Sequence, residues 1–188
     1  MTVRLYGSAG RTLATRGLVV GAGSRDTVRL NDIVHSSGIA SIVTSDAPVV
    51  VERPEYVGSP NGRRVAGSDV FGRNGTASRW SFPGGLSGSD GSGGPGRSLF
   101  LLLFNPSSSA VPVEVTGYEA TGRVVTARVL VAARARATLD ARRFFRGATG
   151  LDGVVARSVD GRGFVAEQTV FAADHSSLES TQGLVIGG

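Results

Sequence analysis

The stretch of the sequence that most resembles a chemical site is residues 91–96, Gly-Ser-Gly-Gly-Pro-Gly, in which three glycines have the spacing G-x-G-x-x-G. In dinucleotide-binding enzymes this spacing marks a loop that holds a pyrophosphate at the start of a helix. Here Pro95 lacks an amide hydrogen, and the following residues 98–104 (SLFLLLF) have the pattern of a buried strand. We therefore interpret residues 84–97 as a glycine-rich loop and expect no cofactor.

The two histidines, His35 and His175, are the next candidates for acid–base chemistry or metal binding. Asp174, His175 and Ser176 are the residue types of a hydrolase triad, but sequence neighbours seldom point at one another, and no G-x-S-x-G elbow occurs. The chain has no cysteine and no D-x-D-x-D calcium loop. We expect no catalytic residue and no metal site, and we place both histidines on surface hairpins.

The most function-like cluster consists of Arg142, Arg143, Phe144, Phe145 and Arg146. Arginine beside aromatic rings can bind phosphates, sulfates, uronic acids or sugar faces through charge-assisted hydrogen bonds and stacking. In the alternative interpretation, the phenylalanines pack into the end of the fold while the arginines are solvated. The cluster is the candidate ligand-binding site of the sequence.

The elements that must position these residues are strands. Short runs rich in Val, Leu, Thr and aromatic residues follow one another at intervals of about 8 to 12 residues, separated by turn residues such as Gly10, Gly122, Gly161 and Asn61-Gly62. The runs are TVRLY, RGLVV, DTVRL, IASIV, VVVER and EYV, then LFLLLF, VPVEVTGY, RVVTARVLV, VVARSV and FVAEQTVF. Only residues 141–147 suggest a short turn of helix. The pattern predicts an all-β fold, a sandwich.

An internal repeat organises these runs. Residues 3–11 (VRLYGSAGR) match residues 115–123 (VTGYEATGR), which aligns Tyr6 with Tyr118. The two tyrosines are therefore assigned structural roles at equivalent places. The fold class expected from the repeat is two tandem β-sandwich modules.

A second pair of matching segments aligns two glutamates. Residues 45–57 match residues 159–172, which places Glu52 opposite Glu167. A carboxylate on a strand between buried neighbours needs a partner such as Arg53 or another arginine, because an unpaired buried charge is costly. Its recurrence in both copies favours a structural role for the two glutamates over catalysis.

The two copies differ in length at their start. The stretch from Trp80 to Val113 precedes the second match and has no counterpart before the first. We therefore expect an incomplete module at residues 1–77, a complete one at residues 78–188, and a linker near residues 72–79. Missing strands leave an unpaired edge and an apolar groove, which we expect an upstream segment or a strand of another chain to complete by β-addition.

Several motifs carry a resemblance to a known group of proteins. Two motifs in order carry it, Trp80-Ser81-Phe82-Pro83-Gly84-Gly85 and then Leu101-Leu102-Leu103-Phe104-Asn105-Pro106. In these motifs the chain resembles the repeat modules of uncharacterised secreted or membrane-anchored bacterial proteins, especially from actinobacteria. The resemblance implies an immunoglobulin-like or fibronectin-like sandwich found in tandem outside the membrane, without an established activity. Trp80, Phe82, Asn105 and Pro106 are expected to be structural. No functional residue carries over.

Charge and hydropathy limit the location and the partners. All 20 basic residues are arginine, which leaves a formal charge of +5, but the arginines are scattered and their use fits a GC-rich genome. We expect no specific nucleic-acid partner. No run approaches the roughly 20 apolar residues that span a bilayer, and residues 1–7 (MTVRLYG) do not form a signal peptide. Together with the resemblance, this makes the cell envelope or the cell exterior the expected location. We expect the chain to be a fragment or a mature piece of a longer protein.

The sequence thus predicts a non-enzymatic structural, spacer or adhesive β-sandwich module outside the cytoplasm, which self-associates or accepts a strand from its parent chain. The alternative is a module that binds a polyanion or acidic cell-envelope polysaccharide through residues 142–146. A hydrolase is a distant third.

Overall fold

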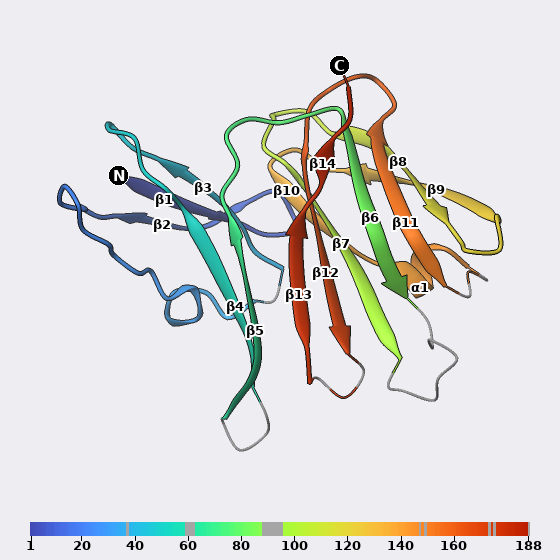
Figure 1. The fold of residues 1–188 in the computed structure, drawn as a ribbon. Coiled ribbons are helices and arrows are strands. Elements are labelled where there is room, and N and C mark those ends of the chain that lie inside the picture. The colour runs from blue at the N-terminus through green and yellow to red at the C-terminus, as the bar shows by residue number, and fades with distance from the viewer. Residues whose placement is uncertain are drawn as a thin grey trace.

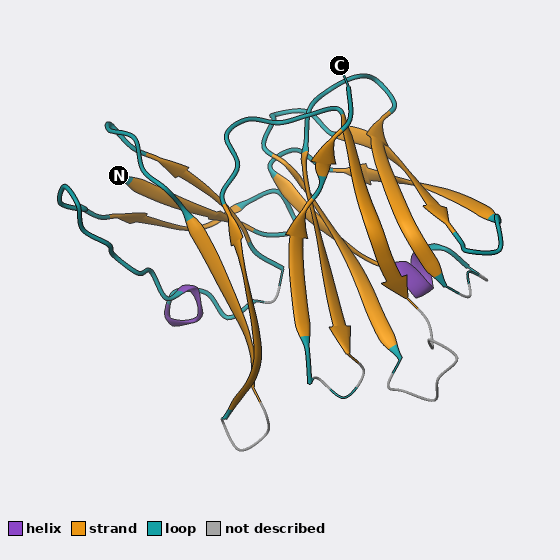
Figure 2. Cartoon of the chain, in the orientation of Figure 1, coloured by secondary structure: helices purple, strands orange, loops and turns teal. Residues whose placement is uncertain are grey.

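The computed structural model describes residues 1–36, 38–58, 63–87, 96–146, 148, 150–172, 174 and 176–187. The regular secondary structure of the described chain is nearly all strand, with one 3-10 turn, η1 (Leu30–Asp32), and one turn of helix, α1 (Ala141–Phe144) (Figure 2). In chain order the strands are β1 (Thr2–Tyr6), β2 (Thr12–Gly17), β3 (Ala40–Thr44), β4 (Glu52–Gly58), β5 (Arg64–Phe71), β6 (Arg79–Ser87), β7 (Arg97–Asn105), β8 (Val111–Tyr118), β9 (Val124–Val131), β10 (Ala135–Asp140), β11 (Leu151–Ser158), β12 (Val165–Ala172), β13 (Leu178–Gln182) and β14 (Leu184–Val185). The predicted all-β fold is confirmed, and no helix in the described residues is long and apolar enough to cross a membrane.

The C-terminal segment, residues 78–188, is a two-sheet sandwich. One sheet has the order β10-β7-β12-β13 and the other the order β14-β6-β11-β8-β9, with antiparallel pairing throughout. Figure 1 shows these two sheets beside each other and the strands β1 to β5 grouped on one side of them.

The core lies between the two sheets. Leu99, Leu101 and Leu103 alternate along β7, Val111, Val113 and Val115 alternate along β8, and all six are fully buried. Because side chains alternate along a strand, the residues between these leucines face the opposite side of the sheet. The continuous apolar run at residues 98–104 can therefore form a central strand.

Two buried polar side chains hold the ends of this sandwich. Trp80 is fully buried, and its Nε1 donates to the carbonyl oxygens of Ala77 and Phe164, both at 3.1 Å. Asn105 is also fully buried; its Nδ2 donates to carbonyls of the turn after β7 and of the end of β9, at distances from 2.8 to 3.1 Å. Its Oδ1 accepts from the backbone and the hydroxyl of Ser107. These contacts explain why an Asn and a Trp flank the apolar strand.

The N-terminal segment, residues 1–77, forms two smaller pieces of sheet. Its order β2-β1-β3 corresponds to β9-β8-β11, and its hairpin β4-β5 corresponds to β12-β13. The hairpins also agree in register: Glu52 pairs with Phe71 as Glu167 pairs with Gln182. In the described residues, nothing pairs with β3 and β4 as β6 and β7 pair with β11 and β12.

The predicted strand DTVRL, residues 26–30, is wrong. This segment has no strand geometry and leads into η1. Its place in the sequence corresponds to β10, which obtains its ladder hydrogen bonds from β7. Because no strand lies in the position of β7 beside this segment in the described structure, its alternating side chains have no ladder to join. RGLVV is likewise strand only at Arg16 and Gly17, the end of β2.

The turns agree with the sequence prediction more closely than these two strands do. Gly10, Gly122 and Gly161 have φ values of 73°, 82° and 78°, which glycine adopts without a steric penalty. The Asn61-Gly62 pair lies outside the described residues, as do residues 91–95 of the glycine-rich loop.

The expected linker at residues 72–79 is held on both sides. The amide of Gly72 donates to the carbonyl of Val51 at 2.7 Å, and Ala77 exchanges backbone hydrogen bonds with Phe164. The guanidinium of Arg73 lies 4.7 Å from the ring centroid of Trp80, within range of a cation–π contact. The segment therefore fixes the two halves of the chain to each other.

Candidate functional site

The two equivalent hairpins meet across the boundary between the halves of the chain. The face of β12-β13 directed away from the core, its outer face, carries Glu167, Thr169 and Ser180. The β4-β5 hairpin turns its inner face, with Arg53, Glu55, Ser68 and Val70, toward it. The amide of Ser180 donates to Ser68 Oγ at 2.9 Å, and its hydroxyl donates to Glu55 Oε2 at 2.8 Å. Thr169 and Ser180 are consequently buried.

Four charged residues form what we call the charged clasp: Arg53, Glu55, Glu167 and Arg136. Arg53 makes ion pairs with both Glu55 and Glu167, and so joins a strand of the N-terminal segment to β12. On β10, Arg136 Nη1 donates to the carbonyl of Ile39 at 2.7 Å.

Burial dominates the electrostatics of the clasp. It raises the pKa of Glu167 above its ordinary value of 4.5, although the charge of Arg53 acts in the opposite direction. It also lowers the pKa of Arg136, and the positive charge of Arg53 adds to that effect. Arg53 joins Glu55 and Glu167, and Arg136 holds the carbonyl of Ile39, so the clasp is suited to joining the two halves of the chain.

A second contact fixes the other end of the N-terminal segment. The ring of Tyr6 lies 5.7 Å from that of Phe104, centroid to centroid, and the amide of Arg136 donates to the carbonyl of Gly7 at 3.2 Å. Leu5 is buried at 1% exposure. The sheet β10-β7-β12-β13 therefore carries the sandwich core on one face and contacts with the N-terminal segment on the other.

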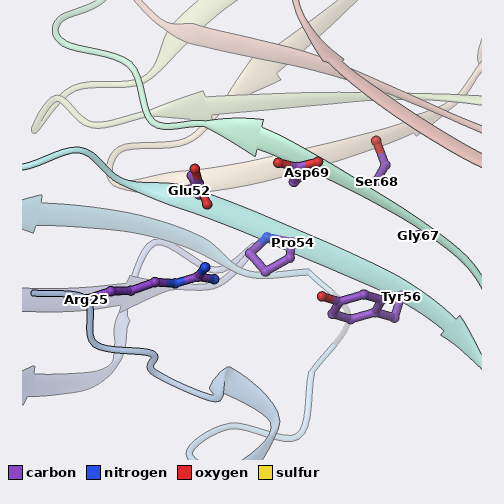
Figure 3. A pocket seen from close by; sticks show the side chains of 7 residues that line it. All are labelled: Arg25, Glu52, Pro54, Tyr56, Gly67, Ser68 and Asp69. Atoms are coloured by element: carbon purple, nitrogen blue, oxygen red, sulfur yellow. The ribbon is translucent and has the colours of Figure 1, made fainter.

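The opposite, outer face of the β4-β5 hairpin forms a hollow of ≈ 420 Å³ (Figure 3). We call it the hairpin hollow; its lining residues are Arg25, Glu52, Pro54, Tyr56, Gly67, Ser68 and Asp69. A Cβ on Gly67 would lie 3.0 Å from Cδ1 of Tyr56, so the glycine leaves room for the tyrosine ring over the strand. The side chain of Tyr56 remains 57% exposed.

The charges of the hollow differ from Arg53, Glu55 and Glu167 of the clasp, which are joined by ion pairs. Arg25, Glu52 and Asp69 form no ion pair within the described part of the chain. Arg25 reaches the hollow from the loop on one side of β4, and Asp69 stands on β5, on the other side (Figure 3).

The hollow corresponds, position by position, to the face that is covered in the C-terminal segment. Glu52 has the register of Glu167, and Arg25 in SRDTVRL stands at the place of Arg136 in ARATLDA. The same two residue types thus recur on both faces. The face with Glu167 is buried by the neighbouring hairpin, whereas the face with Glu52 is exposed.

The arginine–phenylalanine cluster divides between surface and core. Arg142, Arg143 and Arg146 are exposed, but Phe145 is 2% exposed and belongs to the sandwich core. Phe144 packs against that core and meets the ring of Phe145 edge-on at 5.1 Å. Phe145 is thus packed inside the sandwich, whereas the three arginines of the cluster face outward.

The residues that the repeat aligns with each other differ in their burial and in their partners. Glu167 has the arginine partner expected for it, but Glu52 is exposed and has no ion pair in the described chain. Tyr6 is buried, whereas Tyr118 is 42% exposed at the end of β8. Similar sequence therefore does not give similar burial, because only one member of each pair faces the other half of the chain.

The remaining candidates show no site chemistry where they are described. His35 is exposed, and His175 lies outside the described residues. No group of three His, Cys, Asp or Glu residues in the described chain could hold a metal ion. Sequence reasoning missed Arg25, Glu55, Arg136, Ser68 and Ser180; the match of Arg25 with Arg136 was the available signal.

Comparison with known proteins adds little. No protein-family model matches the chain, and no curated protein matches it. Among solved structures, it is similar to a protein described as Thermotoga maritima 1070, with a TM-score of 0.49 and 18% identity over 60% of this chain and 97% of the other.

Proposed function

We propose that this protein is a non-enzymatic structural or spacer module of the cell envelope or cell exterior, built from two related β-sandwich repeats. The observation that supports it most is the charged clasp. Arg53, Glu55 and Glu167 are the titratable groups gathered most closely at the contact between the repeats, and they are bonded to one another. Repeats that are joined by such a contact suit a spacer, which keeps the segments on either side of it at a fixed distance.

The test is whether the clasp couples the two segments mechanically. The full chain is stretched between its termini in single-molecule force experiments. We expect one cooperative unfolding step for the wild type, and two separate steps for the double variant Arg53→Ala/Glu167→Ala, which cuts the contact between β4 and β12. Arg128→Ala/Glu114→Ala is the matched control, because that ion pair lies within one sheet. Separate unfolding of the halves in the wild type would contradict the proposal.

A second candidate function is polyanion binding at the exposed arginines. Arg142, Arg143 and Arg146 all lie on or beside α1, and Arg143 forms an ion pair with Asp140 at 3.5 Å. Acidic glycans would be held by charge without stacking on Phe145. Salt-dependent retention on heparin should fall when the three arginines are replaced by serine.

The control for this second candidate replaces three other exposed arginines, Arg4, Arg11 and Arg16, by serine. Equal loss of retention in both triple variants would reduce the binding to the general positive charge of the chain and contradict a site at residues 142–146.

A further inference from the structure

The outer face of the β4-β5 hairpin has the composition of a contact surface. Its exposed apolar side chains are Tyr56 at 57%, Val65 at 47% and Phe71 at 60%, all on the side of the hairpin away from the clasp. Three large apolar side chains on one face of a two-stranded hairpin are more than scattered surface residues, and such patches commonly mark protein contacts.

The equivalent face of the C-terminal segment shows what happens to a surface of this kind. There Thr169 and Ser180 are 3% and 7% exposed, because the neighbouring hairpin covers them. The register positions of these two residues in the N-terminal hairpin belong to Pro54 and Asp69, which are exposed. The same sheet face is thus covered by protein in one half of the molecule and uncovered in the other.

The charges around the hairpin hollow indicate the kind of partner. Arg25 stands on one side of β4, and Asp69 on the other, with Glu52 at the start of the strand (Figure 3). None of the three forms an ion pair within the described residues. A second copy that faces this hollow across a two-fold axis between the chains presents the same charges, its Arg25 toward these carboxylates and its carboxylates toward the first chain's Arg25.

We propose that the hairpin hollow is the interface through which two copies of this chain associate as a symmetric dimer. The inference rests on the proposed structural function, for which it names the partner. Each Arg25 meets Glu52 and Asp69 of the other chain, and the exposed Tyr56 and Phe71 rings fill the space between the hairpins. A second chain satisfies both signs of charge at once, as self-complementary interfaces require.

The experiment measures the mass of the full chain by sedimentation over a concentration series. The wild type should pass from monomer to dimer. Arg25→Glu alone, and Glu52→Arg/Asp69→Arg together, should each weaken the dimer by at least about tenfold, because like charges then face each other. Since the three side chains are exposed, folding should be preserved, which circular dichroism and melting temperature check.

The decisive measurement is the sedimentation of a mixture of the two charge variants. In a mixed pair, every contact between position 25 and positions 52 and 69 again joins opposite charges, so the mixture should form dimers although neither variant does alone. Tyr56→Ser should also weaken the dimer, whereas Tyr118→Ser, an exposed tyrosine on β8, should not.

Three results would overturn the proposal. They are a wild type that stays monomeric up to its solubility limit, a dimer that all of these variants leave unchanged, and a mixture that fails to restore association. The proposed structural function fails on different evidence, the separate unfolding of the two halves, so the two failures can be told apart.

Discussion

Pro54 and Thr169 occupy the same register position in two equivalent hairpins, but only Thr169 has an amide hydrogen to donate. Pro54 pairs with Asp69 in β5 as Thr169 pairs with Ser180 in β13. The amide of Gly72 bonds to the carbonyl of Val51, so by alternation the backbone at position 54 points away from β5, to the free edge of β4. At the equivalent edge of β12, Thr169 lies opposite Phe100 of β7.

This difference makes β4 a protected edge. Proline on the outward side of an edge strand removes a donor that an incoming strand would need. Pro54→Thr should restore that donor and allow strand addition, giving concentration-dependent aggregation that light scattering detects. Pro48→Thr is the control, because Pro48 is exposed in the loop before β4. Equal aggregation of both variants would show that the edge at Pro54 is not special.

The clasp should make stability depend on pH. Burial raises the pKa of Glu167 above 4.5, so the folded chain binds this proton more tightly than the unfolded chain. The contribution of Glu167 to the free energy of unfolding is then fully present below pH 4.5 and is lost as pH rises through the raised folded pKa. The stability of the wild type relative to Glu167→Gln should fall over that window in denaturant titrations.

The control for this prediction is Glu52→Gln, at the equivalent register position on the exposed face. A relative stability of the wild type that rises with pH would mean that the ion pair with Arg53 outweighs the burial of Glu167.

Asn105 should be one of the most sensitive polar positions. Asn105→Ala leaves the carbonyls of Ser109, Val131 and Ala132 without their donor inside the protein, which should cost about 3 kcal/mol in the free energy of unfolding. Urea unfolding monitored by Trp80 fluorescence measures it. Asn31→Ala, at an exposed position in η1, should change stability by less than about 0.5 kcal/mol.

Gly183 allows the chain to pass close to the aromatic core. A Cβ there would lie 2.7 Å from Cζ of Phe82 and 3.0 Å from Cε3 of Trp80, and both rings are buried. Gly183→Ala should therefore destabilise the fold by about 1–3 kcal/mol, seen as a lower melting temperature. Gly153→Ala is the matched control on β11, where the nearest atom would be 3.6 Å away. Similar losses in both variants would contradict close packing as the cause.

The sequence by itself determined that the fold is all-β. The continuous apolar run 98–104 predicted a buried strand, and glycine at positions 10, 122 and 161 predicted turns, because both depend on local sequence. The structural roles expected for Trp80 and Asn105 came from the resemblance to bacterial repeat modules and not from a local pattern.

Only the tertiary structure decided which equivalent residues are buried. DTVRL alternates like a strand, but no described segment pairs with it through ladder hydrogen bonds, so it is not one. Glu52 and Glu167 look alike in sequence, yet one lines an open hollow and the other joins Arg53 inside the molecule. Pairing and burial are contacts between distant segments, and a repeat in the sequence does not say which of its two faces the other half of the chain will cover.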